Sequence, residues 1–330
     1  MMDRPSLRAR VATRMVRVVV KHWARGSPEA VVRRARWVFG YPGFLTFVHS
    51  HGVRIKRVET PEVRGEWVCP ASCSLPDRVL LYLHGGGYVS CSSRTHRPVT
   101  TSLARMAQCR VFSLDYRWAP EYPFPAAVDD AAAAFSWLVK SGVAPGNIAL
   151  AGDSAGAGLV IATMLRLRAQ GRALPGCAVC LSPWVDLTGA AKYQNAGSCS
   201  MFQPVDIAIF GGLYLQGASP ESPEASPLFA DLSGLPPLLI QVSSKELLLD
   251  DAVRLHQKAV RSGVKSTLSV FPELPHVWQI LFGLIPEAST ALHQIANFIR
   301  ASFGIGELPA AYPVMSEGKT PVSAVEKIPK

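Results

Sequence analysis

The sequence predicts an α/β fold, in which a mostly parallel sheet of eight strands carries helices on both faces and a helical cap. Eight short β-rich runs occur along the chain, and stretches with helical periodicity separate the later ones. Strands that alternate with helices form parallel pairs joined by crossovers. The runs cover residues 53–58, 66–69, 79–83, 111–115, 148–151, 178–181, 238–242 and 267–271.

The expected helices occupy residues 100–108, 126–140, 155–169, 251–262 and 287–301. No helix separates the first two β-rich runs, so we expect these two strands to form an antiparallel pair at one edge of the sheet. The chain has 330 residues, of which 48% are hydrophobic, and no linker or repeat divides it. A chain of this size can bury one large core, so we expect a single large domain over residues 51–314.

Two segments outside this alternation are expected to form the cap. The first is residues 1–50, in which residues 5–48 show helical patterns with a break at Gly26-Ser27-Pro28, where Ser27 can cap the second helix. Residues 186–236 form an insertion rich in Gly, Ser and Pro, with one helical pattern at 205–215. The last residues, 315–330, lack large apolar residues at regular spacing and are expected to form a flexible tail.

The N-terminal segment carries most of the positive charge, with ten Lys or Arg and two acidic residues in the first forty. Its apolar residues share one helical face: Leu7, Val11, Met15, Val18 and Val19. The favoured interpretation is a lid whose apolar face covers the body of the protein, since Trp23 and Trp37 also need burial. The alternative is a basic amphipathic helix in peripheral contact with an anionic membrane.

Composition argues against several classes of protein. The basic residues are concentrated at one end, so the whole chain does not resemble a nucleic-acid-binding protein. No apolar stretch is long enough for a transmembrane segment, and no signal peptide is evident. Cys177 and Cys180 lie in an apolar run and are interpreted as buried small residues rather than a metal or redox site. Reduced thiols suggest a cytoplasmic protein.

The first motif with chemical content is GDSAG at residues 152–156, which follows a β-rich run and precedes an expected helix. A nucleophilic serine needs such a sharp turn between strand and helix, with small neighbours that let the chain pass closely. We therefore expect Ser154 to be the nucleophile. The alternative is a glycine-rich turn without chemistry.

The second motif, HGGG at residues 84–87, directly follows the run VLLYL. Acyl transfer needs N–H groups at the developing oxyanion, and glycines leave those groups unobstructed. The amides of Gly85, Gly86 and Gly87, with that of Ala155, are the expected oxyanion hole. His84 is expected to brace this loop rather than to carry a proton.

An acid and a histidine follow the last two strands. Glu246 comes after the run LLIQV, and His276 comes after TLSVF. The carboxyl ends of parallel strands meet at one edge of a sheet, where the first two motifs also emerge. We therefore expect His276 as the general base and Glu246 as the acid that orients it, with Asp250 or Asp251 as the alternative acid.

The residues HGGGY, the sequence DYRWAPEYPFPAAVDD at 115–130 and GDSAG resemble the bacterial hormone-sensitive-lipase-like esterases, from about residue 70 to 298. The resemblance implies an α/β-hydrolase fold and a serine carboxylesterase that acts on a small-molecule ester. It also implies no metal, no cofactor and a homodimer. The usual family pattern is D-P-L-x-D, whereas residues 246–250 read ELLLD, which places Glu246 at the catalytic position. Other residues at family positions are interpreted as braces for loops, with an ion pair from Arg117 to an acid: Arg117, Glu121, Asp129, Asp153 and Asp186.

The substrate pocket is expected to be lined by the cap and by aromatic residues, namely Tyr88, Trp184, Phe202, Phe210, Tyr214 and Trp278. By analogy with the family, this predicts short- to medium-chain acyl groups. Two other functions stay open. One is a non-catalytic small-molecule receptor on the same fold, and the other is an amidase, deacetylase or peptidase with the same triad.

Overall fold

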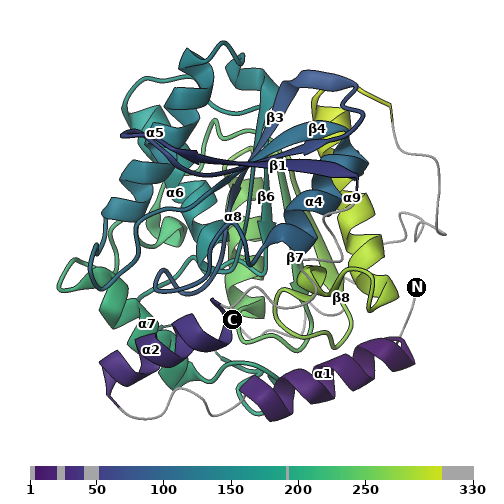
Figure 1. Cartoon of the computed structure of the whole chain (residues 1–330). Coiled ribbons are helices and arrows are strands. Elements are labelled where there is room, and N and C mark those ends of the chain that lie inside the picture. The colour runs from purple at the N-terminus through teal and green to yellow at the C-terminus, as the bar shows by residue number, and fades with distance from the viewer. Residues whose placement is uncertain (1–3, 21–26, 41–51, 191–192, 307–330) are drawn as a thin grey trace.

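A computed structural model describes residues 4–20, 27–40, 52–190 and 193–306, and its eight strands form one sheet (Figure 1). The order across the sheet is β1-β2-β4-β3-β5-β6-β7-β8. The strands are β1 (Val53–Glu59), β2 (Arg64–Pro70), β3 (Leu75–Leu83), β4 (Cys109–Leu114), β5 (Ile148–Asp153), β6 (Cys177–Leu181), β7 (Leu238–Ser243) and β8 (Ser266–Phe271). Each of the eight predicted strands is confirmed.

The pairing of the strands divides the sheet into two parts. β1 pairs with β2 and β2 with β4 in antiparallel fashion, so the predicted antiparallel edge is confirmed. From β4 through β3, β5, β6 and β7 to β8 every pair is parallel. The carboxyl ends of the parallel strands therefore lie at one rim of the sheet, as a shared site requires.

Helices cover both faces of the sheet, as Figure 1 shows. They are α4 (Arg97–Ala107), α5 (Ala126–Lys140), α6 (Ala155–Ala169), α8 (Leu249–Arg261) and α9 (Pro286–Ser302). Successive residues of a strand point to opposite faces. Along β3, Leu81 therefore joins the core beneath α5, α6 and α8, while Leu80 joins the core beneath α4 and α9.

Three further helices, α1 (Leu7–Val20), α2 (Pro28–Val38) and α7 (Pro204–Leu215), lie on one side of the molecule (Figure 1). α2 begins as predicted, because the Ser27 side chain accepts a hydrogen bond from the Ala30 amide. Arg36 ties α2 to the body through a two-pronged ion pair with Glu121 and a hydrogen bond to the Val89 carbonyl. Of the expected cap and tail, residues 1–3, 21–26, 41–50, 191–192 and 315–330 fall outside the described ranges.

The predicted orientation of α1 is wrong. Its apolar residues face solvent, with Leu7 68% and Val18 79% exposed, whereas the buried residues are Ala9 and Val20. The helix contacts the body through small alanines, and Ala9 packs in a cluster with Leu274 and Trp278. Trp37 is likewise exposed rather than buried. Within the ranges given above, no helix is both long and apolar enough to cross a membrane.

Candidate active site

Ser154 lies on a sharp turn between β5 and α6. Its backbone angles, φ 54° and ψ −120°, fall in a region that residues with a side chain rarely adopt. The turn is held by hydrogen bonds from the Ser154 amide to the Leu181 carbonyl, at 2.8 Å, and from the Trp184 amide to the Ser154 carbonyl, at 3.1 Å. A Cβ on Gly156 would lie 2.1 Å from the Leu83 carbonyl oxygen, so the flanking glycine is required by the close passage of β3.

Glu246 and His276 are in direct contact. Oε2 of Glu246 lies 2.5 Å from Nδ1 of His276, and both side chains are buried. The other carboxylate oxygen accepts hydrogen bonds from the Ser182 hydroxyl and from the Ser243 amide, each at 2.8 Å. A proton shared between Nδ1 and the carboxylate leaves Nε2 as the nitrogen that can accept a proton. Nε2 has no hydrogen-bond partner within the described ranges, and His276 lines the same cavity as Ser154.

The other candidate acids lie elsewhere. Asp250 is 3.5 Å from Arg254, and Asp251 accepts hydrogen bonds from the backbone amides of Val185 and Asp186. Burial and the nearby charge of Asp186 raise the pKa of Asp251 to about 7, although the two backbone hydrogen bonds lower it. This carboxyl group therefore supports the backbone after Trp184 instead of orienting His276.

Two residues that sequence reasoning missed hold the acid in place. Ser182 follows β6 at the same rim, and its hydroxyl also accepts a hydrogen bond from the Val277 amide at 3.4 Å. Asn195 donates to the carbonyls of Ser244 and Glu246, both at 3.0 Å. The position of Ser182 after a parallel strand could have identified it. No pattern marks Asn195, which lies in the irregular insertion.

Two of the three glycines at residues 85–87 line the cavity. Gly86 and Gly87 have φ angles of 107° and 62° and line the cavity. The amide of Gly85 donates to Oδ1 of Asp153 at 3.1 Å, so this amide is already occupied. The assignment of Gly85 to the oxyanion hole is therefore wrong, and its role is to anchor the loop.

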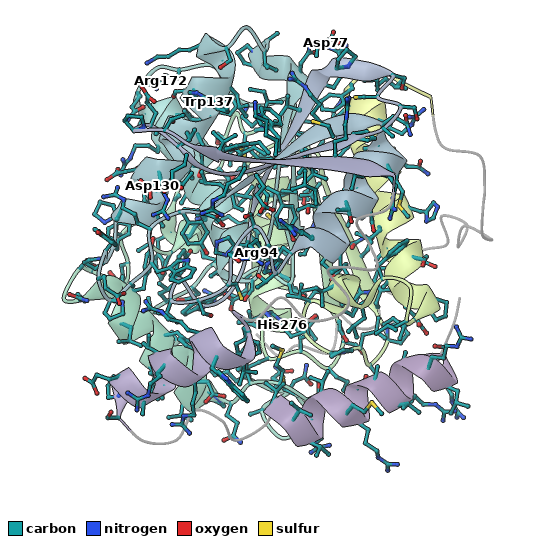
Figure 2. The ribbon with its side chains drawn as sticks, viewed as in Figure 1. Asp77, Arg94, Asp130, Trp137, Arg172 and His276 are labelled. Carbon is teal, nitrogen blue, oxygen red and sulfur yellow. The ribbon has the colours of Figure 1, made fainter. Side chains whose placement is uncertain are left out.

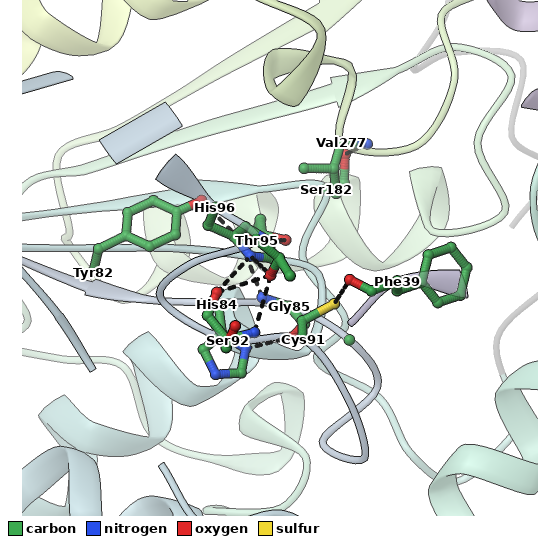
Figure 3. Close-up of polar contacts among 12 residues, drawn as sticks. Phe39, Tyr82, His84, Gly85, Cys91, Ser92, Thr95, His96, Ser182 and Val277 are labelled. Atoms are coloured by element: carbon green, nitrogen blue, oxygen red, sulfur yellow. Dashed lines mark hydrogen bonds and ion pairs between the residues drawn. The ribbon is translucent and has the colours of Figure 1, made fainter. Parts of the chain in front are cut away.

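A buried polar cluster around Asp153 supports this anchor, and Figure 3 labels its members Tyr82, Gly85 and His96. Besides the Gly85 amide, Asp153 accepts a hydrogen bond from the Tyr82 hydroxyl at 2.8 Å, and its second oxygen lies 3.2 Å from Nε2 of His96. Burial opposes ionisation of Asp153 and His96, but their mutual attraction prevails: it lowers the pKa of Asp153 and raises that of His96. The pair thus joins the turn at Ser154, the glycine loop and the start of α4.

His84 is a neutral brace in this cluster, as the sequence predicted. Its ring is buried and stacks on Tyr116 with a centroid distance of 4.3 Å. Burial and the neighbouring His96 lower the pKa of His84 to about 4, so it stays uncharged at neutral pH. The Tyr116 hydroxyl donates to the His84 carbonyl and holds the loop from its other side.

Ser154 and His276 open into a mainly apolar cavity of about 270 Å³. Its wall contains the predicted Trp184, Phe202 and Phe210, and also residues that were not predicted: Val38, Phe39, Cys91, Met201, Ile207, Val277 and Ile280. The other pocket predictions are wrong. Tyr88 and Tyr214 stack on each other, with ring centroids 3.7 Å apart, and Trp278 packs on Phe271 in the core beside α1. None of these three rings lines the cavity.

The remaining charged residues singled out from the sequence form ion pairs, and that of Asp129 with Arg166 joins helices α5 and α6 rather than loops. Arg117 pairs with Asp130, which lay outside the named set, and Asp186 pairs with Arg254. Cys177 and Cys180 are buried and free on β6, as predicted. The described ranges contain no group of three His, Cys, Asp or Glu side chains that could hold a metal ion.

Comparison with known proteins agrees with this architecture. A family model described as alpha/beta hydrolase fold matches residues 80–280. An acetyl-hydrolase of Streptomyces hygroscopicus is 44% identical over 243 residues, which cover 73% of this chain and 81% of that protein. An esterase of Acinetobacter venetianus is 35% identical over 256 residues, covering 76% of this chain and 84% of that protein. The crystal structure of an esterase from the bacterial hormone-sensitive lipase family aligns with a TM-score of 0.83 and 41% identity, over 91% of this chain and 99% of that one.

The fold and these similarities define the chain as an α/β-hydrolase. Within that class it belongs to the hormone-sensitive-lipase-like carboxylesterases, as the sequence motifs predicted, and it is an ester hydrolase.

Proposed function

We propose that the protein is a serine carboxylesterase that cleaves short- to medium-chain acyl esters through an acyl-enzyme, with Ser154, His276 and Glu246 as its catalytic triad. The observation that carries this proposal is the 2.5 Å contact between Glu246 and His276 beside the strained turn of Ser154. This arrangement matches the nucleophile, base and orienting acid of a triad.

In the proposed mechanism, Nε2 of His276 takes the proton of the Ser154 hydroxyl as its oxygen attacks the ester carbonyl carbon. Glu246 holds the imidazole in the required tautomer and stabilises the imidazolium that forms. The amides of Gly86, Gly87 and Ala155 receive the oxyanion. His276 then protonates the departing alcohol, and a water molecule activated by His276 releases the acid from Ser154.

The size of the cavity supports a limit on the acyl chain. Its volume of about 270 Å³ lies below the roughly 300–1,000 Å³ of sites for drug-sized ligands. A similar structure, 35% identical with a TM-score of 0.83, was soaked with p-nitrophenyl butyrate, and a relative carries the name acetyl-hydrolase. Both are consistent with short acyl groups.

Three coarser features complete the proposal. Residues 1–50 and 186–236 form the cap of a catalytic domain spanning 51–314. The enzyme forms a homodimer and resides in the cytoplasm, where its seven free cysteines would stay reduced.

The test is hydrolysis of p-nitrophenyl esters from acetate to dodecanoate. We expect the wild type to prefer the short members of the series. Ser154→Ala, His276→Ala and Glu246→Ala should each lose at least about a hundredfold in kcat. Asp250→Ala is the matched control, because Asp250 pairs with Arg254 and should leave kcat near the wild-type value. Full activity of Glu246→Ala would reject the assigned acid, and a wild type inert on all esters would favour the receptor function.

A further inference from the structure

The outer face of α1 carries an apolar stripe. Leu7, Val11, Met15 and Val18 recur at intervals of four, four and three residues, so they lie along one side of the helix. All four are exposed, by 68%, 48%, 64% and 79% of their surface, and Val19 beside them by 70%. A helix that met only water would carry polar residues on this side, so the stripe indicates a binding surface.

Arginines border the stripe on both sides. Residues 4–20 contain Arg4, Arg8, Arg10, Arg14 and Arg17, all exposed, and no acidic residue. At about 100° per residue, Arg10, Arg14 and Arg17 flank one side of the stripe and Arg8 the other. None of the five forms an ion pair within the described residues, and Arg17 makes one hydrogen bond, to the Gly197 carbonyl at 3.4 Å. These cationic groups are therefore available to an anionic partner.

We propose that α1 docks the enzyme on an anionic lipid surface. The stripe would enter the apolar boundary of the bilayer, while the arginines extend sideways to bind the phosphate groups of the lipids. The charges favour this partner over a second copy of the chain, because a twofold pairing of α1 helices would bring the same arginines together without acids to match them.

The inner face of α1 connects this surface to the site. Ala9 packs in one cluster with Leu274 and Trp278, which precede and follow His276 by two residues. The start of α1 is anchored on α9, because the Ser6 amide and hydroxyl donate to Glu287 at 2.6 and 3.0 Å. α1 is thus fixed to the segment that carries His276.

The second cap helix lies on the same side of the molecule as α1 (Figure 1). Val38 and Phe39 at the end of α2 line the cavity, while Trp37 is 76% exposed. Figure 2 shows His276 on the side of the molecule that carries α1 and α2. Docking through α1 would therefore bring the cap close to the bilayer, and esters dissolved in that lipid surface would be the substrates. This last step rests on the proposed function, whereas docking itself rests on α1 alone.

The experiment is co-sedimentation of the full-length protein with sucrose-loaded vesicles. One set contains equal parts of phosphatidylglycerol and phosphatidylcholine, and the other contains phosphatidylcholine alone. We expect binding to the anionic set that weakens in 0.5 M salt, since salt screens exposed charges. Val18→Glu removes part of the stripe and adds a negative charge, and should weaken binding about tenfold. Arg10→Gln should weaken it about fivefold.

Val260→Glu is the matched control, because Val260 is a half-exposed valine on α8 outside the stripe. It should leave vesicle binding within about twofold of the wild type. All variants should keep the thermal midpoint and the hydrolysis of soluble p-nitrophenyl butyrate, since none of these side chains is buried or lines the cavity.

Two results would overturn the proposal. A wild type that fails to sediment with anionic vesicles at low salt, while Val18→Glu converts a dimer into a monomer in analytical ultracentrifugation, would assign the stripe to an interface between copies. Equal losses of vesicle binding in Val18→Glu and Val260→Glu would show that the apolar stripe of α1 has no special role in binding. Vesicle binding without ester hydrolysis would leave the docking proposal standing and reject the proposed function.

Discussion

The carboxylate of Glu246 lies 2.5 Å from Nδ1 of His276. Glutamate is one methylene longer than the aspartate of the family pattern, so its longer side chain has to be held back to make this contact. Its other oxygen is held by the Ser182 hydroxyl and the Ser243 amide. Asn195 also binds the carbonyls of Ser244 and Glu246, which lie on the loop carrying the acid. Three hydrogen bonds to the carboxylate and two to its loop thus fix the position of the longer side chain beside His276.

Shortening this acid should reduce activity. Glu246→Asp cannot keep both the His276 contact and the bonds to Ser182 and Ser243, so we expect kcat to fall by about tenfold. Glu246→Gln removes the charge that stabilises the imidazolium and should cost roughly 10³–10⁴ in kcat. Steady-state kinetics with p-nitrophenyl butyrate measure both. Glu273→Gln, on the exposed loop before His276, is the control, and an equal loss there would indicate damage to the loop instead.

Neutralising Asp153 should impair both stability and rate. Asp153→Asn removes the buried charge that faces His96, so we expect a loss of about 2 kcal/mol in the free energy of unfolding. The weaker anchor of Gly85 should lower kcat by about tenfold with little change in KM. Urea denaturation and steady-state kinetics measure the two effects. Asp77→Asn, an exposed aspartate on β3, should change neither. Wild-type values for Asp153→Asn would contradict the role of the cluster.

Enlarging the cavity should shift the preferred chain length. Phe210 lines the cavity and lies against Gly87, where a Cβ would come within 2.9 Å of its ring. We expect Phe210→Ala to move the optimum of the p-nitrophenyl ester series towards longer chains and to cost about 3 kcal/mol of stability.

The matched control for that substitution is Tyr214→Phe. Tyr214 is buried on the same helix, but its hydroxyl has no hydrogen-bond partner within the described ranges. Its loss should leave both the chain-length profile and stability nearly unchanged. A changed chain-length profile in Tyr214→Phe would indicate that Tyr214 contributes to the substrate pocket.

The carboxyl group of Asp251 should make stability depend on pH. Its pKa is about 7 in the folded protein and near 3.8 when unperturbed, because burial and Asp186 disfavour its charged form. The folded state therefore binds this proton more tightly than the unfolded chain does. The resulting stability is fully present below about pH 4 and is lost as pH rises to about 7.

Replacing Asp251 tests this linkage. Asp251→Asn keeps an oxygen for the amides of Val185 and Asp186 and cannot ionise. It should match the wild type near pH 4 and exceed it by roughly 2–4 kcal/mol at pH 8. Urea denaturation from pH 4 to 9 measures the difference. A constant difference across that range would contradict the assigned pKa.

The alternation of strands and helices could be predicted from the sequence because it follows from local hydrophobic periods. The helices predicted at 126–140 and 155–169 match α5 and α6 residue for residue. The strand predicted at 79–83 begins earlier, at Leu75, where Pro76 and Asp77 obscure the pattern and the register with β4 shifts. The motifs that meet at the rim were found because parallel strands deliver their carboxyl ends to one place.

Side-chain direction could not be predicted in the same way. The period of α1 shows that it has an apolar face, but its packing is decided by small alanines such as Ala9 on the opposite side. Tyr88 and Tyr214 are aromatic and near the site, yet they stack on each other across a long stretch of chain. The amide of Gly85 is taken by Asp153, a contact that no spacing in the sequence reveals.

Asp153 is the chain neighbour of Ser154 and also binds the first glycine of the oxyanion loop. One carboxylate therefore connects the turn that carries the proposed nucleophile to the loop that carries the proposed oxyanion amides. This connection lies at the ends of β3 and β5, which pair directly with each other in the sheet. Heating should consequently separate the Ser154 turn from the glycine loop only when the sheet itself melts.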